Sequence, residues 1–210
     1  MHVKFIIIIL FLMTGLTGYA QPINVIAKHG NIWLIDTSGR EIQLTTTGKD
    51  SMPVLSWNRK YVACIRKTTG SKYMSNDFDS SQIWLFKLDS NKSELLIQSK
   101  ADSMNAMSVL RGGFDALQFS LDSRYLYFLS DAWTMSMAVH RVDIETKKDQ
   151  FLSDGNSLYI IPNGADAGDL IVLKHKYHNY NGTGSYDDNW LLAPDGTEIK
   201  DIGLYKLEVK

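Results

Sequence analysis

Short apolar runs separated by polar turns fill most of the chain. Runs such as 32–36, 61–65, 83–88, 125–129 and 170–173 are rich in β-branched and aromatic residues, and Gly, Asn, Asp or Ser stands between them. This spacing is typical of β-strands. No stretch carries the 3.6-residue apolar period of a long amphipathic helix. The pattern therefore predicts an all-β fold.

One unit recurs four times: an apolar strand that ends in an aspartate, a polar turn and a second apolar strand. The aspartates are Asp36, Asp89, Asp143 and Asp195, at intervals of 53, 54 and 52 residues. A further pair of strands lies between these units, at 53–65, at 117–129 and in a weaker form at 158–173. Each repeat thus holds four strands, which is the size of a propeller blade. We predict a four-bladed β-propeller with four antiparallel strands in each blade.

The first copy of this strand pair, at 53–65, resembles a known family of repeats. The run 53–60 and the strand 61–65 that follows it resemble the TolB-like and WD-like propeller repeat, in which a Ser-Pro-Asp-Gly-Lys turn precedes a Tyr-Ile-Ala-Phe strand. Trp57, Asn58 and Arg59 stand where the family has Pro-Asp-Gly. The resemblance covers nearly all of residues 23–203. It implies the propeller fold but no particular chemistry.

The first twenty residues predict an export signal. Lys4 gives a basic start, residues 5–16 are almost all apolar, and small residues precede a cleavage site after Ala20. The apolar run is shorter than the about 20 residues of a membrane span. The alternative is a retained N-terminal anchor. We expect residues 21–210 to form a single propeller domain in the periplasm, with no membrane span after cleavage.

The strand count predicts how the ring closes. Three strands, at 23–27, 32–36 and 41–45, precede the first complete set of four, so one strand is missing from the first blade. The segment Tyr205–Val209 alternates apolar and polar residues and can supply that strand. Closure of this kind removes exposed sheet edges. The alternative is that the chain is a piece of a larger propeller.

Charge and cysteine content narrow the classes of partner. The 22 basic and 23 acidic residues leave a net charge of -1, which gives no excess to attract nucleic acid or an anionic membrane. Cys64 is the only cysteine, so an internal disulfide is excluded. Its apolar strand predicts a buried, inert thiol. We expect a protein partner and a monomer in the free state.

The long links point to a binding face. In a propeller, the links at 68–81, 100–113, 132–136 and 176–188 share one end, and short turns occupy the other. The long links carry aromatic, methionine and acidic side chains, which are typical of protein interfaces. The candidate partner-binding residues are Tyr73, Asp77, Phe78, Asp79, Met104, Met107, Trp133, Met135, Tyr177, His178, Tyr180, Tyr186, Asp187 and Asp188. The alternative is that the aromatic residues fold back and cap the blades.

Catalytic and metal patterns are weak. Ser185 with His175 or His178 could form a Ser-His-Asp site, but residues 182–186 do not form a nucleophile elbow. The two histidines with Asp187 and Asp188 could bind zinc, although histidines three residues apart on a strand need not converge. We expect no catalytic residue, no metal and no cofactor.

Three functions are compatible with these observations. The leading hypothesis is a periplasmic, non-enzymatic, protein-binding propeller, because small exported propellers of this kind resemble immunity proteins that occlude a cell-wall-targeting toxin or enzyme. The second hypothesis is an envelope scaffold or assembly module like TolB. The third is a lyase or glycan hydrolase with its site in the central channel. Such a site would need polar residues on the innermost strands, whereas the candidates Val54, Leu117 and Leu158 are apolar.

Overall fold

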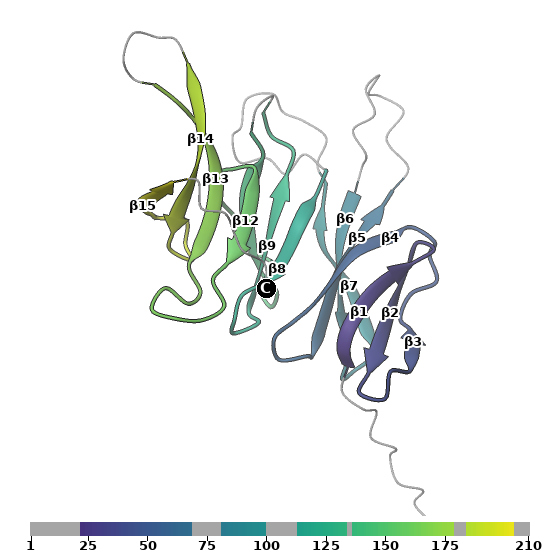
Figure 1. Cartoon of the computed structure of the whole chain (residues 1–210). Coiled ribbons are helices and arrows are strands. Elements are labelled where there is room, and N and C mark those ends of the chain that lie inside the picture. Colours follow the sequence, from purple (N-terminus) through teal and green to yellow (C-terminus); the bar gives the residue numbers. More distant parts are fainter. Residues whose placement is uncertain (1–21, 69–80, 100–112, 134–135, 179–183, 204–210) are drawn as a thin grey trace, which may run out of the picture.

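The strands predicted from the sequence form four antiparallel sheets. The computed structural model describes residues 22–68, 81–99, 113–133, 136–178 and 184–203. All regular secondary structure in these ranges is β-strand, in fifteen strands (Figure 1). The predicted export signal and its cleavage site lie outside the described residues.

Each sheet is formed by strands that are consecutive in the sequence. Sheet 1 contains β1 (Pro22–Lys28), β2 (Asn31–Asp36) and β3 (Glu41–Gln43). Sheet 2 contains β4 (Asp50–Leu55), β5 (Tyr61–Lys67), β6 (Ser81–Lys87) and β7 (Lys92–Gln98). Sheet 3 contains β8 (Asp115–Phe119), β9 (Tyr125–Ser130), β10 (Ala138–Asp143) and β11 (Asp149–Asp154). Sheet 4 contains β12 (Ser157–Ile160), β13 (Leu170–Tyr177), β14 (Ser185–Leu192) and β15 (Glu198–Gly203). The predicted all-β fold with four blades is confirmed.

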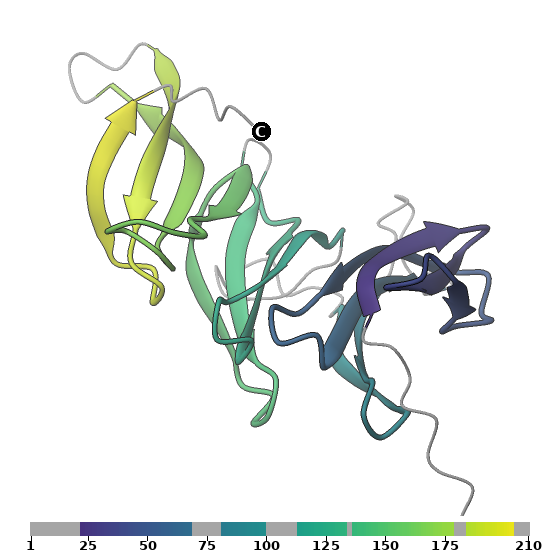
Figure 2. The same ribbon diagram turned by 60° about the horizontal axis from the view of Figure 1, so that its bottom comes forward.

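The four sheets are stacked in chain order around a common inner side. Their first strands, β1, β4, β8 and β12, lie at the inner edge, and each contacts the next. Figure 2 shows the described sheets as an arc with sheet 1 at one end and sheet 4 at the other. The strand expected to complete sheet 1, Tyr205–Val209, lies outside the described residues, so ring closure by this strand stays a prediction.

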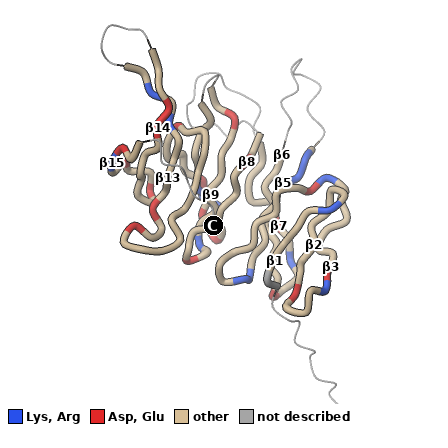
Figure 3. Tube along the Cα trace, in the orientation of Figure 1, with Lys and Arg blue, Asp and Glu red and all other residues tan. Residues whose placement is uncertain are grey.

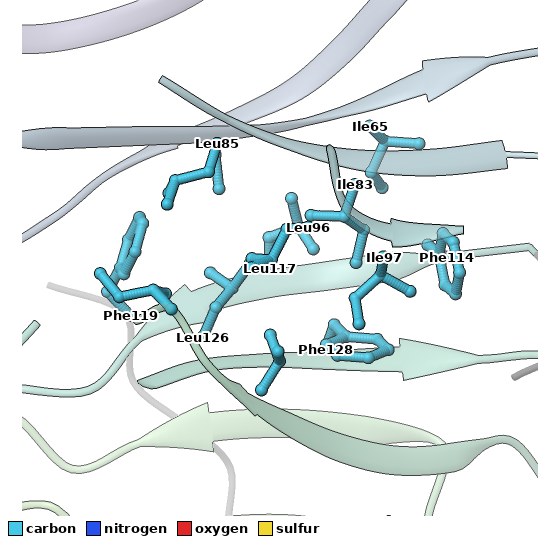
Figure 4. Packing of buried hydrophobic residues seen from close by; sticks show 13 residues of the cluster. Ile65, Ile83, Leu85, Leu96, Ile97, Phe114, Leu117, Phe119, Leu126 and Phe128 are labelled. Carbon is cyan, nitrogen blue, oxygen red and sulfur yellow. The ribbon is translucent and has the colours of Figure 1, made fainter. Parts of the chain in front are cut away.

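The hydrophobic core lies between consecutive sheets. The largest cluster joins sheets 2 and 3 and includes Ile83, Ile97 and Phe128 (Figure 4). Along β9, Leu126 and Phe128 face sheet 2, while the alternate residues face sheet 4. Both faces of the central strands are therefore buried. Burial on both faces explains why these strands are continuous apolar runs in the sequence.

Cys64 belongs to the smaller cluster between sheets 1 and 2. It packs there with Ile32, Val62 and Phe86 and has no exposed surface. Burial, with a smaller effect of the Asp50 charge, raises the pKa of the thiol to about 12. The prediction of a buried thiol is confirmed, and at neutral pH the side chain carries no thiolate to react.

The repeated aspartates stabilise turns. The Asp36 carboxylate accepts hydrogen bonds from the backbone N–H groups of Ser38 at 2.9 Å and Arg40 at 3.0 Å. A hydrogen bond from the Ser38 hydroxyl group, with these backbone bonds, lowers the pKa of Asp36 despite burial of the carboxylate. Asp143 similarly accepts hydrogen bonds from Glu145 N and Thr146 N. Asp195 accepts a hydrogen bond from Thr197 N in the same way, so three of the four repeated aspartates stabilise turns.

The turn between the first two strands of a blade is held by the same side-chain hydrogen bonds in sheets 2 and 3. In sheet 2, Ser56 Oγ donates to Asn58 Oδ1 at 2.8 Å and accepts from Tyr61 N at 2.9 Å. The equivalent turn of sheet 3 repeats these bonds with a serine and an aspartate. At the position where the family has glycine, Arg59 and Ser123 have positive φ angles of 58° and 63°. The altered turn sequence thus retains the conformation that glycine favours.

The links follow the predicted division between the two ends, with one exception. The strand ends that flank the predicted long links lie at the upper end of Figure 1, and the tight turns 57–60 and 121–124 lie at the lower end. The link at 161–169, between β12 and β13, is longer than the other turns at the lower end. Its base is closed by hydrogen bonds from Ile161 N to Asp169 O and from Gly168 N to Ile161 O, both at 2.9 Å.

Replacement of Arg59 tests the turn assignment. A left-handed conformation is unfavourable for a residue with a Cβ atom but not for glycine, whose extra freedom in the unfolded chain offsets part of the gain. We expect Arg59→Gly to increase the free energy of unfolding in urea by about 0.5 kcal/mol. The control Arg59→Ala keeps the Cβ atom and should change it little. A loss of stability in Arg59→Gly alone would contradict the assignment.

Candidate partner-binding site

The most prominent feature at the long-link end is a two-stranded extension of sheet 4. β13 and β14 pair over their full length, from Leu170 with Leu192 to Tyr177 with Ser185. β12 pairs only with the first half of β13, and β15 pairs only with the second half of β14. Residues 174–178 and 184–188 therefore continue as a hairpin without flanking strands, which we call the arm. Figure 1 shows the arm projecting beyond the rest of sheet 4.

One side of the arm carries a histidine–carboxylate pair. His175 Nδ1 lies 2.7 Å from Asp187 Oδ1, and the two residues are direct cross-strand partners. The Tyr177 ring stands perpendicular to the His175 ring, with 5.1 Å between ring centroids. Tyr177 is 67% exposed. Its ring is thus supported by a neighbouring side chain and still available to a partner.

The other side of the arm contains a second pair of rings. His178 lies against Tyr186 with a centroid distance of 5.0 Å. Lys176 Nζ lies over the Trp190 ring, 4.6 Å from its centroid. Lysine and aspartate residues both occur along β13 and β14 (Figure 3), so the arm has no large field of one sign.

A buried lysine fastens the base of the arm to sheet 3. Lys174 is 2% exposed, and its Nζ donates to Ser153 Oγ at 2.6 Å, to Asp154 Oδ1 and to Glu198 Oε1. Burial lowers the pKa of Lys174, but hydrogen bonds to Glu198 and Asp154 raise it, and the net pKa lies above its ordinary value. The hydrogen bond from Lys174 lowers the pKa of Glu198 despite partial burial. We call this group the Lys174 latch.

Removal of the lysine tests the latch. Lys174→Met keeps an unbranched side chain but leaves two partly buried carboxylates without their cation. We expect the free energy of unfolding in urea to fall by about 2 kcal/mol. This loss is smaller than that for a fully buried ion pair, because both carboxylates are partly exposed to water. The control Lys176→Met removes a more exposed ammonium group and should cost less. Equal stability of Lys174→Met and the unchanged protein would contradict the latch.

Trp133, in the link after β9, ends a row of four aromatic rings that contact one another in turn. Its ring meets Phe151 edge-on at 6.2 Å, Phe151 meets His140 at 5.7 Å, and His140 stacks on Phe128 at 5.3 Å. Trp133 is 39% exposed, so the row runs from the core to the surface. Inside this row, His140 Nε2 lies 3.2 Å from Ser130 Oγ, and His140 Nδ1 is buried without a partner.

The buried histidine predicts a pH effect on stability. Burial lowers the pKa of His140 from 6.5 to about 4. A lowered pKa in the folded state gives stability that is fully present above pH 6.5 and is lost as the pH falls towards 4, by about 3 kcal/mol in total. His140→Phe retains the ring stacking and removes the titration. Its stability should therefore decline less than that of the unchanged protein between pH 6.5 and 4, measured by urea unfolding. Parallel declines in the two proteins would contradict this assignment.

The structure brings together part of the predicted binding set. Tyr177, His178, Tyr186, Asp187 and Asp188 all lie on the arm, and Trp133 lies on a different link. The remaining candidates lie outside the described residues: Tyr73, Asp77, Phe78, Asp79, Met104, Met107, Met135 and Tyr180. The sequence prediction missed the latch. Its only signal was a lysine directly after the apolar run 170–173.

The weaker catalytic and metal patterns are not assembled on the arm. His175 and His178 lie on opposite sides of the hairpin, because residues three apart on a strand point in opposite directions. Ser185 pairs with Tyr177 rather than with a histidine. Within the ranges that the structure describes, no three His, Cys, Asp or Glu side chains are grouped as a metal ion would need. The same ranges contain no helix long and apolar enough to span a membrane.

Comparisons with known proteins agree on the fold. No family model and no curated protein matches the chain. The structure of Porphyromonas gingivalis dipeptidyl peptidase 4 is similar with a TM-score of 0.56 and 11% identity, over 86% of this chain and 31% of that one. The β-propeller domain of the Trilobed protease from Pyrococcus furiosus, described as having an open velcro topology, gives 0.54 and 17%, over 82% and 48%. TolB from Acinetobacter baumannii gives 0.49 and 14%, over 80% and 36%.

The two similarities with TM-scores above 0.5, to the dipeptidyl peptidase and to the propeller domain of the Trilobed protease, establish the propeller fold. The chain spans less than half the length of each of the three chains it resembles. At such low identities a similarity of structure carries no information on activity. The predicted resemblance is therefore confirmed for the propeller fold.

Proposed function

We propose that this protein is a non-enzymatic, periplasmic binding protein that uses the arm, together with Trp133, to contact another protein. The observation that carries the proposal is the composition of the arm: a projecting hairpin with exposed Tyr177 and Tyr186 beside Asp187 and Asp188. Tyrosine and tryptophan dominate the binding energy of protein interfaces. Their rings also lose little conformational entropy when a partner covers them.

The anchoring of the arm supports the same proposal. A binding element that is already ordered loses less entropy when the complex forms. The Lys174 latch ties the base of the arm to sheet 3, and the pairs His175–Asp187 and His178–Tyr186 hold its side chains. An arm fixed in this way is suited to enter a concave surface.

The partner that we propose is an exported toxin or enzyme that acts on the cell wall. The arm is narrow, being two strands wide, and combines aromatic rings with carboxylates. Such a hairpin in the cleft of an enzyme would exclude the substrate without any chemistry of its own. The protein would then act as an immunity protein or inhibitor.

Direct binding tests the proposal. The exported form of the protein is titrated against the purified product of the neighbouring gene by biolayer interferometry. We expect saturable binding, and we expect Tyr177→Ala with Tyr186→Ala to raise the dissociation constant at least ~10-fold. Trp57→Ala is the matched control, because Trp57 is 58% exposed and lies at the opposite end of the propeller. The control should bind like the unchanged protein.

The outcome in cells provides the second part of the test. Co-expression should protect a host from the toxicity of that gene product, and the double tyrosine variant should protect less. No binding together with no protection would refute the immunity role. A hydrolytic or lyase activity that is lost in Asp187→Ala and Asp188→Ala would refute the non-enzymatic role.

A further inference from the structure

The link 161–169, between β12 and β13, has no role in the proposed function, since it lies at the end of sheet 4 opposite the arm (Figure 1). Residues 162–167 are all exposed, and they include the dipeptide Asn163–Gly164. Gly164 has a φ angle of 89°, in the left-handed region that favours glycine. The backbone of the link therefore favours a glycine directly after Asn163.

Both functional groups of this dipeptide are uncommitted. Within the described part of the chain, no residue accepts a hydrogen bond from Gly164 N–H, and the Asn163 side-chain amide makes no hydrogen bond. Apart from the neighbours in the chain, no described atom lies within 4 Å of the position that a Cβ atom would occupy at Gly164. The Gly164 nitrogen is thus open to solvent beside a free carboxamide, with no side chain of its own to hinder it.

The dipeptide Asp154–Gly155 has the opposite environment. Gly155 is buried, and its N–H group donates to Met137 O at 2.9 Å. The Asp154 carboxylate is held by the ammonium group of Lys174 at 2.9 Å. Attack by Gly155 N on the Asp154 side chain would first cost this hydrogen bond and this ion pair. The fold therefore protects this dipeptide.

The dipeptide Asp195–Gly196 is protected in a similar way. Gly196 N donates to Ala193 O at 2.9 Å, and Asp195 Oδ1 accepts from Thr197 N at 3.0 Å. Both groups that would have to react are therefore engaged in the turn. Among the described pairs of an Asn or Asp followed by glycine, Asn163–Gly164 alone has both groups free.

We propose that Asn163 is a site of spontaneous deamidation, with water as the only co-reactant. Gly164 N gives up its proton to solvent and attacks Asn163 Cγ, so a C–N bond forms and closes a five-membered succinimide ring. The bond from Cγ to Nδ2 breaks, and Nδ2 takes up a proton and leaves as ammonia. Water then opens the ring at either carbonyl carbon. The products are aspartate and isoaspartate at position 163.

The products change the charge of the link while its base is retained. Each product adds one negative charge close to Asp166 and Asp169. Isoaspartate also adds one carbon atom to the backbone. The hydrogen bonds from Ile161 N to Asp169 O and from Gly168 N to Ile161 O lie outside residues 162–167. We therefore expect both products to keep the pairing of β12 with β13.

Peptide mapping of the aged protein is the first test. The exported form is incubated at neutral and mildly alkaline pH, and tryptic peptides are sequenced by electron-transfer mass spectrometry. We expect Asn163 to become about 1 Da heavier, faster at alkaline pH because more of the attacking nitrogen is deprotonated. The control Asn163→Gln needs a six-membered ring and should stay unchanged. An unchanged Asn163, after a peptide of the same sequence has converted, would overturn the proposal.

Comparison of the folded and urea-unfolded protein tests the role of the structure. The Asn181→Gln background is used, because Asn181–Gly182 is the same dipeptide and lies outside the described residues. Asn163 should convert in the folded protein at a rate within ~10-fold of the unfolded rate. Isoaspartate at Asp154 and Asp195 should form only after unfolding. Stronger protection of Asn163, or isoaspartate at Asp154 in the folded protein, would overturn the assignment.

The outcome is independent of the proposed function, since the link and the arm lie at opposite ends of sheet 4. Asn163→Asp serves as a mimic of one product. It should unfold at the same urea concentration as the unchanged protein and bind any partner of the arm equally well. A large loss of stability in Asn163→Asp would contradict the expectation that the base of the link is retained.

Discussion

Burial of both faces of the central sheets is the constraint on which the structure depends. In β5, Ala63 and Ile65 pack towards sheet 3, while Val62 and Cys64 pack towards sheet 1. A strand that is apolar on both faces is stable only between two other layers, because either exposed face would cost the free energy of its hydration. Stacking of sheets in chain order follows from this pattern. It also makes the two end sheets different from the others, since each has only one neighbour among the described residues.

Polar residues act mainly at the two ends of the strands. At the lower end, Asp36 and Asp143 satisfy the backbone N–H groups of tight turns, and Ser56 with Asn58 does the same in another turn. Different residue types thus make equivalent hydrogen bonds in different turns. The opposite end carries the predicted long links and the arm. The fold therefore separates the residues that stabilise it from the residues proposed to bind a partner.

The arm depends on ionic contacts at its base. Lys174 is a charged residue inside an otherwise apolar interface, and its charge is tolerated because Ser153, Asp154 and Glu198 all accept hydrogen bonds from it. These partners come from β11 and β15, so the latch joins two sheets. The resulting rigidity is compatible with the proposed binding role.

The sequence by itself determined the all-β class, the four blades and the buried cysteine, because each depends on local apolar patterns and on a regular repeat. It also predicted that the link with Tyr177, Tyr186 and the neighbouring aspartates belongs to the end of the propeller with the long links. Only the tertiary structure decided that β13 and β14 extend as one hairpin, that His175 and His178 face opposite sides, and that Lys174 bridges two sheets. These features depend on strand register and on contacts between residues up to 24 positions apart. A local sequence pattern does not indicate which residues this far apart in the chain come into contact, because such contacts form only when the sheets pack together.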